Sequence, residues 1–303
     1  MKKVFIDGSA GTTGLRIAER LAERADLELI RLSEEVRKDP AARRDALNGA
    51  DIAFLCLPDD AAREAVSMIE NPDTVVIDTS TAHRTADGWV YGFPELGGRR
   101  EMVKTAKRIA NPGCHASGFL ALVAPLTERG VLAPDTRLSC FSLTGYSGGG
   151  KKMIAEYEAD GRDALLSAPR LYGLTQKHKH LPEMAKVAGL TNDPVFCPVV
   201  APFYAGMEVI VPLYDVAPET VKAVYADYYQ TGLVHFTENA DEGGFLSAAA
   251  FSGRDDMQVT VTGNGERTLL IARFDNLGKG ASGAAIQNMN LCLGVSETLG
   301  LVV

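Results

Sequence analysis

The sequence lacks several features that would each point to a particular class of protein. Its five cysteines are an odd number, and none forms a CxxC pair or a Cys/His cluster with metal-ligand spacing, so neither a disulfide scaffold nor a metal site is indicated. No long apolar run is uninterrupted: residues 195–213, the most apolar stretch, contain three prolines and a glutamate, which excludes a membrane-spanning helix. These absences, and the lack of an apolar leader after Met1, predict a cytoplasmic protein with reduced thiols.

The charge pattern lacks a basic patch. The net charge of −8 is spread along 303 residues and not gathered into a tail, which argues against nucleic acid or an anionic membrane as the main partner. The composition, 46% hydrophobic and 23% charged, is that of a globular chain long enough for two domains with their own cores. We find no internal repeat or low-complexity linker, and we expect a small-molecule partner.

A strand, a glycine-rich turn and a helix open the chain. Residues 4–7 predict a short buried strand, and residues 15–24 an amphipathic helix. The turn between them has the spacing GxxGxxG, whose glycines allow a sharp bend and a close approach of the backbone to a pyrophosphate at the helix N-terminus. We therefore predict dinucleotide binding over a plain tight turn, with cofactor contacts from Gly8, Ser9, Gly11, Thr12, Thr13 and Gly14.

The second strand, residues 27–32, indicates which dinucleotide. An NAD site usually carries an acidic residue at this strand end for the ribose 2′-hydroxyl, and none is present. Arg31 and Ser33 stand there instead, with Arg37 and Lys38 close behind, which favours the 2′-phosphate of NADP. The adjacent acidic pair at 34 and 35 leaves open that these cations are a solvated surface.

Two further strand and helix units follow, with strands at 51–58 and 74–78 and a helix from about residue 60. Alternating strands and helices predict a Rossmann-type doubly wound parallel sheet, an α/β fold. Ligands bind at the carboxyl ends of strands in such sheets, so Pro58 and Ser80 are expected to line the cofactor crevice. Residues 79–84 and 89–96 are expected to be mostly loop.

The stretch 111–116, Asn-Pro-Gly-Cys-His-Ala, places a cysteine at the start of a predicted helix. Pro112 and Gly113 indicate a turn, and residues 119–126 are an apolar run typical of a buried helix. Unpaired N–H groups and the helix dipole favour the thiolate of Cys114, which would make it a nucleophile near neutral pH. The alternative is a buried structural cysteine, since free cysteines are often buried.

The pattern changes after residue 131. Strands at 136–143 and 208–214 are longer and spaced as in a mainly antiparallel sheet, which predicts a second, α+β domain. Residues 145–152 are expected to form a flexible basic loop able to wrap an anion. We predict a dinucleotide-binding domain over 1–114, a catalytic and oligomerisation domain over 115–283, and a C-terminal helix at about 284–303 that packs back on the first.

Two histidines lie in the segment 176–183. Because Pro182 disfavours helical geometry at the residue before it, residues 177–181 are expected to be extended, with His178 and His180 on one face. Pro182 fits the first position of a helix, so His180 would stand ahead of a positive helix end that favours a neutral imidazole. His180 is therefore the predicted general base, and His178 its neighbour for substrate or phosphate. Two surface histidines are the alternative.

These motifs together resemble the short form of the N-acetyl-γ-glutamyl-phosphate reductases, within the wider semialdehyde dehydrogenase family. The resemblance runs nearly end to end and rests on residues 8–14, 111–114, 147–151, 178–183 and 275–290. It implies NADPH-dependent reduction of an acyl phosphate to an aldehyde, with release of phosphate, in arginine biosynthesis. Close relatives remain open, namely aspartate-semialdehyde dehydrogenase and aminoadipyl-phosphate reductase, and so does a non-catalytic NADP-binding sensor.

Roles for individual residues follow from this chemistry. The Cys114 thiolate would attack the acyl carbon, and the thioester would accept a hydride while a histidine handles the proton. The backbone N–H of Cys114 and the side chain of Asn111 would be oxyanion donors. Substrate contacts are expected from Arg84, Arg108, Lys151 and His178, and further cofactor contacts from Gly148, Asn276 and Gly280. A homodimer or homotetramer is expected, because few helices are predicted to cover the second sheet.

Overall fold

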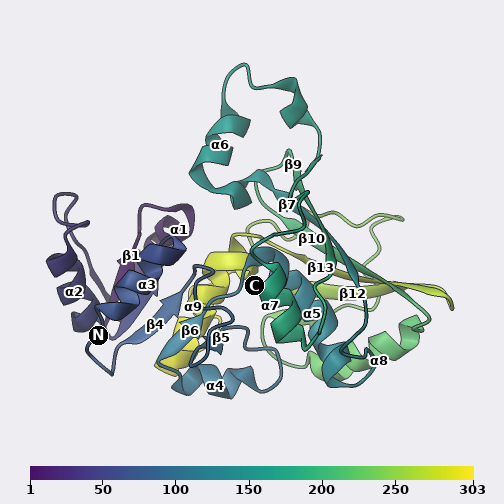
Figure 1. The fold of residues 1–303 in the computed structure, drawn as a ribbon, viewed down its shortest axis with the longest axis horizontal. Helices are drawn as coiled ribbons and strands as arrows, with labels where there is room; N and C mark the ends of the chain where they lie inside the picture. The colour runs from purple at the N-terminus through teal and green to yellow at the C-terminus, as the bar shows by residue number, and fades with distance from the viewer. The chain divides into compact units, whose positions relative to one another are not determined.

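The computed structural model describes residues 1–303, and the chain divides into two compact units (Figure 1). The first unit comprises Met1–Pro94, Arg99–Pro112 and Ala281–Leu301. The second comprises Glu95–Gly98, Gly113–Gly280 and Val302–Val303. No helix in either unit combines the length and apolar character needed to cross a bilayer.

The first unit is a six-stranded parallel sheet with helices on both faces. Its strand order is β2-β1-β3-β4-β6-β5, and every neighbouring pair is parallel. The strands are β1 (Lys2–Asp7), β2 (Leu27–Ile30), β3 (Ile52–Leu55), β4 (Val75–Asp78), β5 (Val90–Tyr91) and β6 (Arg108–Ala110). The helices are α1 (Thr12–Ala22), α2 (Pro40–Gly49), α3 (Asp59–Ser67), α4 (Arg99–Thr105) and α9 (Gly283–Leu293). The predicted doubly wound α/β fold is confirmed.

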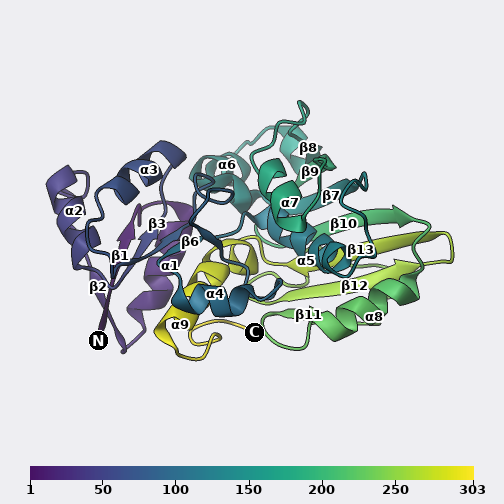
Figure 2. The same cartoon turned by 60° about the horizontal axis from the view of Figure 1, so that its bottom comes forward.

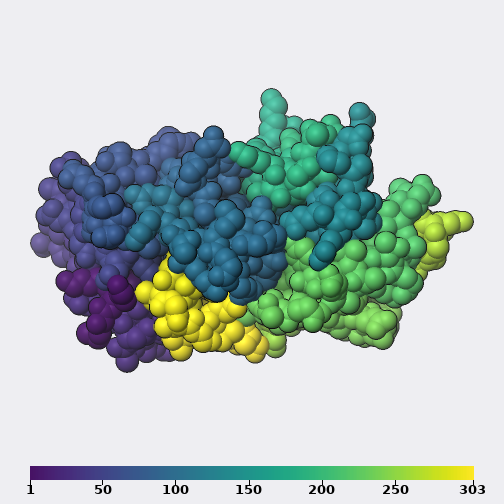
Figure 3. Space-filling view, turned by 90° about the horizontal axis from the view of Figure 1, so that it is seen from below, coloured from purple at the N-terminus to yellow at the C-terminus, as the bar shows by residue number.

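Alternation along the strands produces two apolar cores, one on each face of this sheet. Val4 and Ile6 of β1 pack into the core that α1, α4 and α9 complete, whereas Phe5 packs into the core beneath α2 and α3. Figure 2 shows α3 and α9 on opposite sides of the strands. The C-terminal segment packs beside the N-terminal helix, where Arg24 Nη1 donates to Asn290 Oδ1 at 2.9 Å, and Figure 3 shows these yellow and purple segments on one surface.

The second unit contains a seven-stranded sheet of order β11-β12-β13-β10-β7-β9-β8. Its strands are β7 (Ser139–Gly145), β8 (Arg170–Leu171), β9 (Val195–Ala201), β10 (Met207–Tyr214), β11 (Val234–Phe236), β12 (Met257–Gly263) and β13 (Arg267–Phe274). The pairs β7–β9 and β11–β12 are parallel and the other four are antiparallel, so the expected mainly antiparallel sheet is confirmed.

Helices cover one face of this second sheet. They are α5 (Cys114–Glu128), α7 (Leu181–Ala188) and α8 (Pro218–Tyr228), of which α5 packs on β10 and β13 and α8 on β12 and β13. Twelve consecutive residues of α5, from His115 to Leu126, are buried, so α5 is the central helix of this unit. A further helix, α6 (Gly150–Glu158), stands away from the sheet in Figure 1.

The other face of the second sheet carries exposed apolar side chains. Phe141 of β7 is 44% exposed and pairs with Ile210 of β10, which in turn pairs with Ile271 of β13. By the alternation of side chains along their strands, Leu269 and Val195 point to the same face, where they are 40% and 57% exposed. Their alternating neighbours Cys140, Ser142 and Val209 are buried, and on that side Ser142 and Val209 lie next to residues of α5.

Several expected boundaries are wrong. Residues 145–152 do not form a flexible loop: a 3-10 helix (Tyr146–Gly149) leads directly into α6, held by the stacking of Tyr146 on Tyr157, whose ring centroids are 4.6 Å apart. The last helix is shorter than the expected 284–303, since Gly294 takes a left-handed conformation with φ 67° and ends α9 at Leu293. Helix α1 begins at Thr12 and not at residue 15, because it starts inside the glycine turn.

Candidate active site

The glycine turn after β1 is tight at both of its outer glycines. Gly8 has φ +86°, and a Cβ there would clash with the Cys56 carbonyl. A Cβ on Gly14 would lie 2.5 Å from the Gly8 carbonyl oxygen, so the first turn of α1 packs directly on the loop. Gly11 is the N-cap residue of α1 and provides no side-chain hydrogen bond. The backbone N–H groups at the start of α1 therefore have no side-chain cap, as in a phosphate-binding turn.

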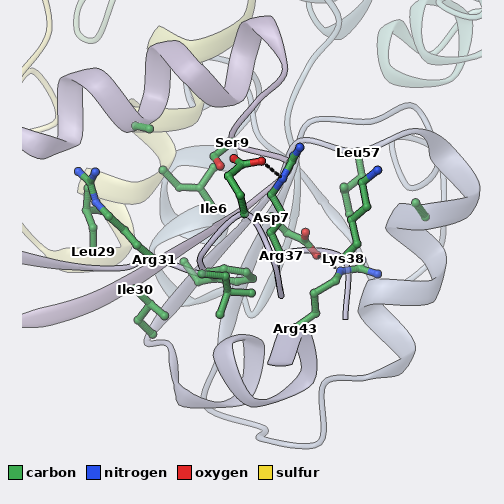
Figure 4. A pocket seen from close by; sticks show the side chains of 16 residues that line it. Ile6, Asp7, Ser9, Leu29, Ile30, Arg31, Arg37, Lys38, Arg43 and Leu57 are labelled. Atoms are coloured by element: carbon green, nitrogen blue, oxygen red, sulfur yellow. Dashed lines mark hydrogen bonds and ion pairs between the residues drawn. The ribbon is translucent and has the colours of Figure 1, made fainter. Parts of the chain in front are cut away.

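A cavity of about 430 Å³ lies beside this turn, at the carboxyl ends of β1 and β2 (Figure 4). Gly8 and Ser9 line it, and so do four cationic side chains, Arg31, Arg37, Lys38 and Arg43. Ser33 is exposed next to it, and Pro58, the N-cap residue of α3, lies beside the lining residue Leu57. Three of the predicted cofactor residues of this unit, Gly8, Ser9 and Arg31, therefore line one cavity, whose cations fit an anionic group. Cofactor contacts from residues 11–14 and from Ser80 stay predictions.

Arg43 is a lining residue that sequence reasoning did not identify. Its Nε and Nη2 donate to Asp7 Oδ2 at 3.1 and 2.9 Å, and both side chains are nearly buried. Burial raises the pKa of Asp7 more strongly than Arg43 lowers it. Arg37 also has an acidic neighbour, since its Nε lies 2.6 Å from Glu34 Oε2. Of the four cations in the cavity wall, Arg31 and Lys38 are thus the two without an acidic partner. Both of them were identified from the sequence.

A second group of polar residues lies at the carboxyl end of β4. Asp78 is fully buried, and its Oδ2 accepts a hydrogen bond from the Ser80 hydroxyl at 2.7 Å. The same oxygen lies 2.6 Å from His83 Nδ1. Arg84 Nε donates to the Asn111 carbonyl oxygen at 3.0 Å. Its Nη2 donates to the Thr79 carbonyl oxygen at 3.1 Å. Two donors of Arg84 are therefore used by the backbone, where they fix the turn that begins at Asn111.

Asn111 is held on all sides within the first unit. Its N–H donates to the Asp78 carbonyl oxygen at 2.7 Å, and its Nδ2 donates to the Ala281 carbonyl oxygen at 3.1 Å. Its Oδ1 accepts from Asn288 Nδ2 at 3.2 Å. The Nδ2 group of Asn111 thus already donates one hydrogen bond, and the residue is only 1% exposed. These contacts show that Asn111 anchors the turn.

The structure places two further predicted substrate residues, Arg108 in the first unit and Lys151 in the second. Arg108 is the first residue of β6, whereas Asn111 follows the other end of that strand, and Arg108 Nη1 donates to the Thr74 carbonyl oxygen at 3.0 Å. Lys151 lies exposed in the first turn of α6. The structure therefore places Arg108 at the amino end of the parallel sheet, away from where ligands bind in such folds.

Cys114 is the first residue of α5, as the turn chemistry predicted. Gly113 is the N-cap residue, without a side-chain cap, and its N–H donates to Glu183 Oε2 at 3.2 Å. A Cβ on Gly280 would lie 2.9 Å from the Cβ of Cys114, so the absence of a side chain at Gly280 makes room for the cysteine. Burial raises the pKa of Cys56 to about 12 and of Cys292 to about 11, which leaves these other thiols protonated near neutral pH.

The two predicted histidines lie together, although the expected extended segment is wrong. The His178 carbonyl oxygen accepts from the Leu181 N–H at 3.1 Å, so residues 178–181 form a turn. His180 has helical angles, φ −88° and ψ −13°, and is the N-cap residue of α7. This turn still brings the rings of His178 and His180 to a centroid distance of 4.7 Å. The local turn hydrogen bond prevailed over the preference that Pro182 imposes on Leu181.

Three further residues, His115, Tyr172 and Glu183, complete the cluster, and no role was assigned to any of them from the sequence. The ring of His115 is 5.6 Å from that of His178 and 5.5 Å from that of His180. His115 Nδ1 lies 2.7 Å from Ser142 Oγ and its Nε2 lies 2.6 Å from Tyr172 Oη. Glu183, 1% exposed, has its Oε1 3.9 Å from His180 Nε2. His115 and Glu183 stand inside motifs that the sequence revealed, whereas nothing in the sequence near Tyr172 marked it.

Burial and nearby charge shift the pKa values of two members of this cluster, His115 and Tyr172. Burial, with a smaller contribution from His178 and Lys179, lowers the pKa of His115 to about 3, so its imidazole is neutral. Burial raises the pKa of Tyr172, and the charge of Cys114 raises it further, so its hydroxyl keeps its proton. A cysteine at a helix N-terminus, a cluster of imidazoles and a phenol donor can together support nucleophilic attack and proton transfer.

The remaining predicted cofactor residues of the second unit have structural partners. Asn276 Oδ1 accepts from the Gly206 N–H at 3.0 Å, and its Nδ2 donates to Ser147 Oγ at 3.0 Å. Gly148 lies beside Asn276, at the 3-10 turn that follows β7. These contacts hold the loops around β7 and β10 in place, and a role for Gly148 and Asn276 in cofactor binding stays a prediction.

Comparisons with known proteins agree with this architecture. Residues 35–106 match the semialdehyde dehydrogenase NAD binding domain, and residues 114–276 match the semialdehyde dehydrogenase dimerisation domain. The chain is 46% identical to N-acetyl-gamma-glutamyl-phosphate reductase 2 of Nostoc sp., over 99% of each chain. It is 47% identical to N-acetyl-gamma-glutamyl-phosphate reductase of Mesorhizobium japonicum, over 97% of this chain and 99% of that one.

Solved structures show the same fold at lower identity. The crystal structure of aspartate semialdehyde dehydrogenase II from Vibrio cholerae, complexed with ASA, matches with a TM-score of 0.73 and 20% identity, over 97% of this chain and 98% of that chain. Aspartate semialdehyde dehydrogenase with NADP from Candida albicans matches with a TM-score of 0.68 and 14% identity, over 97% and 99% of the two chains. The chain therefore belongs to the semialdehyde dehydrogenase family and, by its relatives of 46–47% identity, to the N-acetyl-γ-glutamyl-phosphate reductases within it.

Proposed function

We propose that this protein reduces N-acetyl-γ-glutamyl phosphate to N-acetylglutamate semialdehyde with NADPH and releases phosphate, a step of arginine biosynthesis. The observation that carries the proposal is Cys114 at the start of α5, in the unit where His115, His178 and His180 cluster. The relatives named for this activity match over almost the whole chain. All five cysteines are free, which suits the reducing cytoplasm where we expect the reaction.

The proposed reaction begins at Cys114. Its thiolate attacks the acyl carbon, a C–S bond forms, and the bond from carbon to the phosphate oxygen breaks, which releases inorganic phosphate. The N–H groups at the start of α5 stabilise the negative charge on the carbonyl oxygen during this attack. Glu183, by accepting from the Gly113 N–H, holds the backbone of this helix start in place.

Reduction and release of the aldehyde complete the cycle. Bound NADPH would supply the hydride that converts the thioester to a thiohemiacetal. His180, which takes the proton of the Cys114 thiol when the thiolate forms, gives this proton to the thiohemiacetal oxygen as that group forms and takes it back as the C–S bond breaks, which frees the aldehyde and the Cys114 thiolate. His178 lies next to His180 and orients the acyl group or its phosphate. Asn111 and Arg84 act as positioning residues, since both anchor the turn before Cys114.

The residues of the first unit fit NADP. The uncapped N–H groups at the start of α1 suit the pyrophosphate, and the cavity at the end of β2 contains Arg31 and Lys38, which suit a 2′-phosphate. Glu34 also lines this cavity, but its Oε2 lies 2.6 Å from Arg37 Nε, and the strand end itself carries no acidic residue for a 2′-hydroxyl. This arrangement supports NADPH as the preferred reductant.

The experiment that tests the function is NADPH oxidation measured with three acyl phosphates. We expect turnover with N-acetyl-γ-glutamyl phosphate and at least about 100-fold lower kcat/KM with aspartyl or aminoadipyl phosphate, since unmatched polar groups in a site are strongly rejected. Cys114→Ser should abolish turnover and remove the site that iodoacetamide labels first. Turnover with aspartyl phosphate alone, or an active Cys114→Ala protein, would refute the proposal, and binding of NADP without any turnover would indicate a sensor.

We further propose a homodimer or homotetramer built through the exposed part of the other face of the second sheet, around Phe141, Val195 and Leu269. Phe141, Val195 and Leu269 are exposed there, on either side of Ile210. A contiguous apolar face of this kind is usually buried against a partner, and a second copy with two-fold symmetry is the most common one. Sedimentation at micromolar concentration should give a mass two or four times 32.4 kDa, and a stable 32.4 kDa monomer would refute this proposal.

A further inference from the structure

Glu95 and Lys279 form a buried ion pair in the second unit that the proposed reaction does not use. Lys279 Nζ lies 2.9 and 2.8 Å from the two carboxylate oxygens of Glu95, and the side chains are 2% and 1% exposed. Glu95 Oε1 also accepts from the Leu233 N–H at 2.8 Å. Because two charges lose much hydration when they are buried, such a pair is weak evidence for stability, and another role is worth seeking.

Lys279 stands in an unusual piece of backbone. Residues Gly278–Ser282 form a single π-helical turn just before α9. Such turns are rare in proteins, and those that occur are often found at functional sites. Asp275, which is fully buried, fixes the start of this turn: its carbonyl oxygen accepts from the N–H groups of Gly278 and Gly280 at 3.1 and 3.0 Å. The turn is therefore anchored through its backbone by Asp275 and through its side chain by Glu95.

The residue after Lys279 touches the proposed nucleophile. A Cβ on Gly280 would lie 2.9 Å from the Cβ of Cys114 and 3.1 Å from the Asp275 carbonyl oxygen, so no space remains between this backbone and the cysteine. A shift of Gly280 by a few tenths of an ångström toward α5 would press on Cys114 and change its side-chain position. The placement of Lys279 thus determines the space in which the thiol stands.

We propose that Glu95 and Lys279 are positioning residues for Cys114, acting through Gly280. The carboxylate of Glu95 holds the ammonium group of Lys279, this contact fixes the π-helical turn, and the turn sets the wall against which the Cys114 side chain packs. The inference rests on the proposed function in one respect, since Cys114 is the nucleophile there. It requires no contact of Glu95 or Lys279 with substrate or cofactor.

The test replaces the pair by apolar residues of similar size in the full-length protein, as Glu95→Leu with Lys279→Met, because a buried pair exchanged for apolar side chains is often tolerated. Two quantities are measured: kcat and KM with N-acetyl-γ-glutamyl phosphate, and the rate at which iodoacetamide alkylates Cys114 at one fixed pH. We expect kcat to fall about 10- to 100-fold with KM nearly unchanged, and the alkylation rate to change at least about threefold, since small displacements of a reacting group have large effects.

The exposed ion pair of Arg129 and Asp227, whose Nη2 and Oδ2 lie 2.7 Å apart in the same unit, provides the control. Arg129→Met should leave kcat and the alkylation rate as in the unmodified protein. A folded double variant with unchanged kcat and alkylation rate would overturn the proposal. If the double variant does not fold, Lys279→Arg decides, since its longer, planar head must displace the turn, and an unchanged alkylation rate would equally overturn it. The alkylation result stands even if the substrate proves to be another acyl phosphate, so the two proposals fail separately.

Discussion

The buried imidazole of His115 predicts a specific dependence of stability on pH. Its pKa is lowered from 6.5 to about 3, so between these values the folded state stays neutral at His115 while the unfolded state binds a proton. Since the unfolded state then binds more protons, stability falls as the pH decreases through this window. From pH 7 to pH 5 the loss amounts to about 2 kcal/mol for this one group, because each pH unit below 6.5 contributes about 1.4 kcal/mol.

The perturbation that isolates this effect is His115→Gln. An amide cannot titrate in this range, yet it can still bond one of the two hydroxyls that His115 contacts, those of Ser142 and Tyr172. The variant will be less stable than the unmodified protein at pH 7, because the second hydroxyl loses its partner. At pH 5 we expect this difference to shrink by about 2 kcal/mol, since only the unmodified protein loses stability at His115.

Hydrogen exchange of the buried α5 amides is the appropriate assay. It reports the opening of the unit that contains His115, whereas the only tryptophan, Trp89, lies in the first unit and would report that one. His235→Gln, at an exposed histidine on β11, is the matched control. A difference between His115→Gln and the unmodified protein that is the same at pH 5 and pH 7 would refute the reasoning and show that His115 is protonated in the folded state.

Three further predictions concern the site and the assembly. Arg31→Ala with Arg37→Ala should reduce the preference for NADPH over NADH at least about tenfold, since hydrogen bonds to a charged phosphate contribute about 1.5–3 kcal/mol; equal use of both cofactors by the unmodified protein would contradict the NADP assignment. His180→Asn should lower kcat by about 10² to 10⁴ and remove the acidic limb of the pH-rate profile, whereas His178→Asn should mainly raise KM. The reverse pattern would exchange the two roles. Ile210→Glu should convert the oligomer to a 32.4 kDa species in sedimentation, because a buried unpaired charge disrupts an apolar interface; an unchanged oligomer would exclude this face.

The candidate site residues that the sequence identified are those whose contacts in the structure are with residues close to them along the chain. The place of Cys114 at the start of α5 follows from a Pro-Gly turn and an apolar run on either side of it, and the glycine turn at 8–14 follows β1 directly. Helix starts and tight turns depend on hydrogen bonds between residues a few positions apart, so local sequence largely specifies them. The same locality explains the error at residues 177–181, where a turn bond to the His178 carbonyl competed with the preference imposed by Pro182.

Contacts between distant parts of the chain were decided by the tertiary structure alone. Lys279 and Glu95 are separated by 184 positions, Asp7 and Arg43 by 36, and His115 and Tyr172 by 57. Each of these side chains has many possible partners of the right chemistry in the sequence. Which one it meets depends on strand order and on how α2, α5 and the turn before α9 pack, and packing is a property of the whole fold and not of any segment. Composition, turns and strand-helix alternation thus determined the fold class and the place of the proposed nucleophile at a helix start, while packing determined which charges and rings lie together.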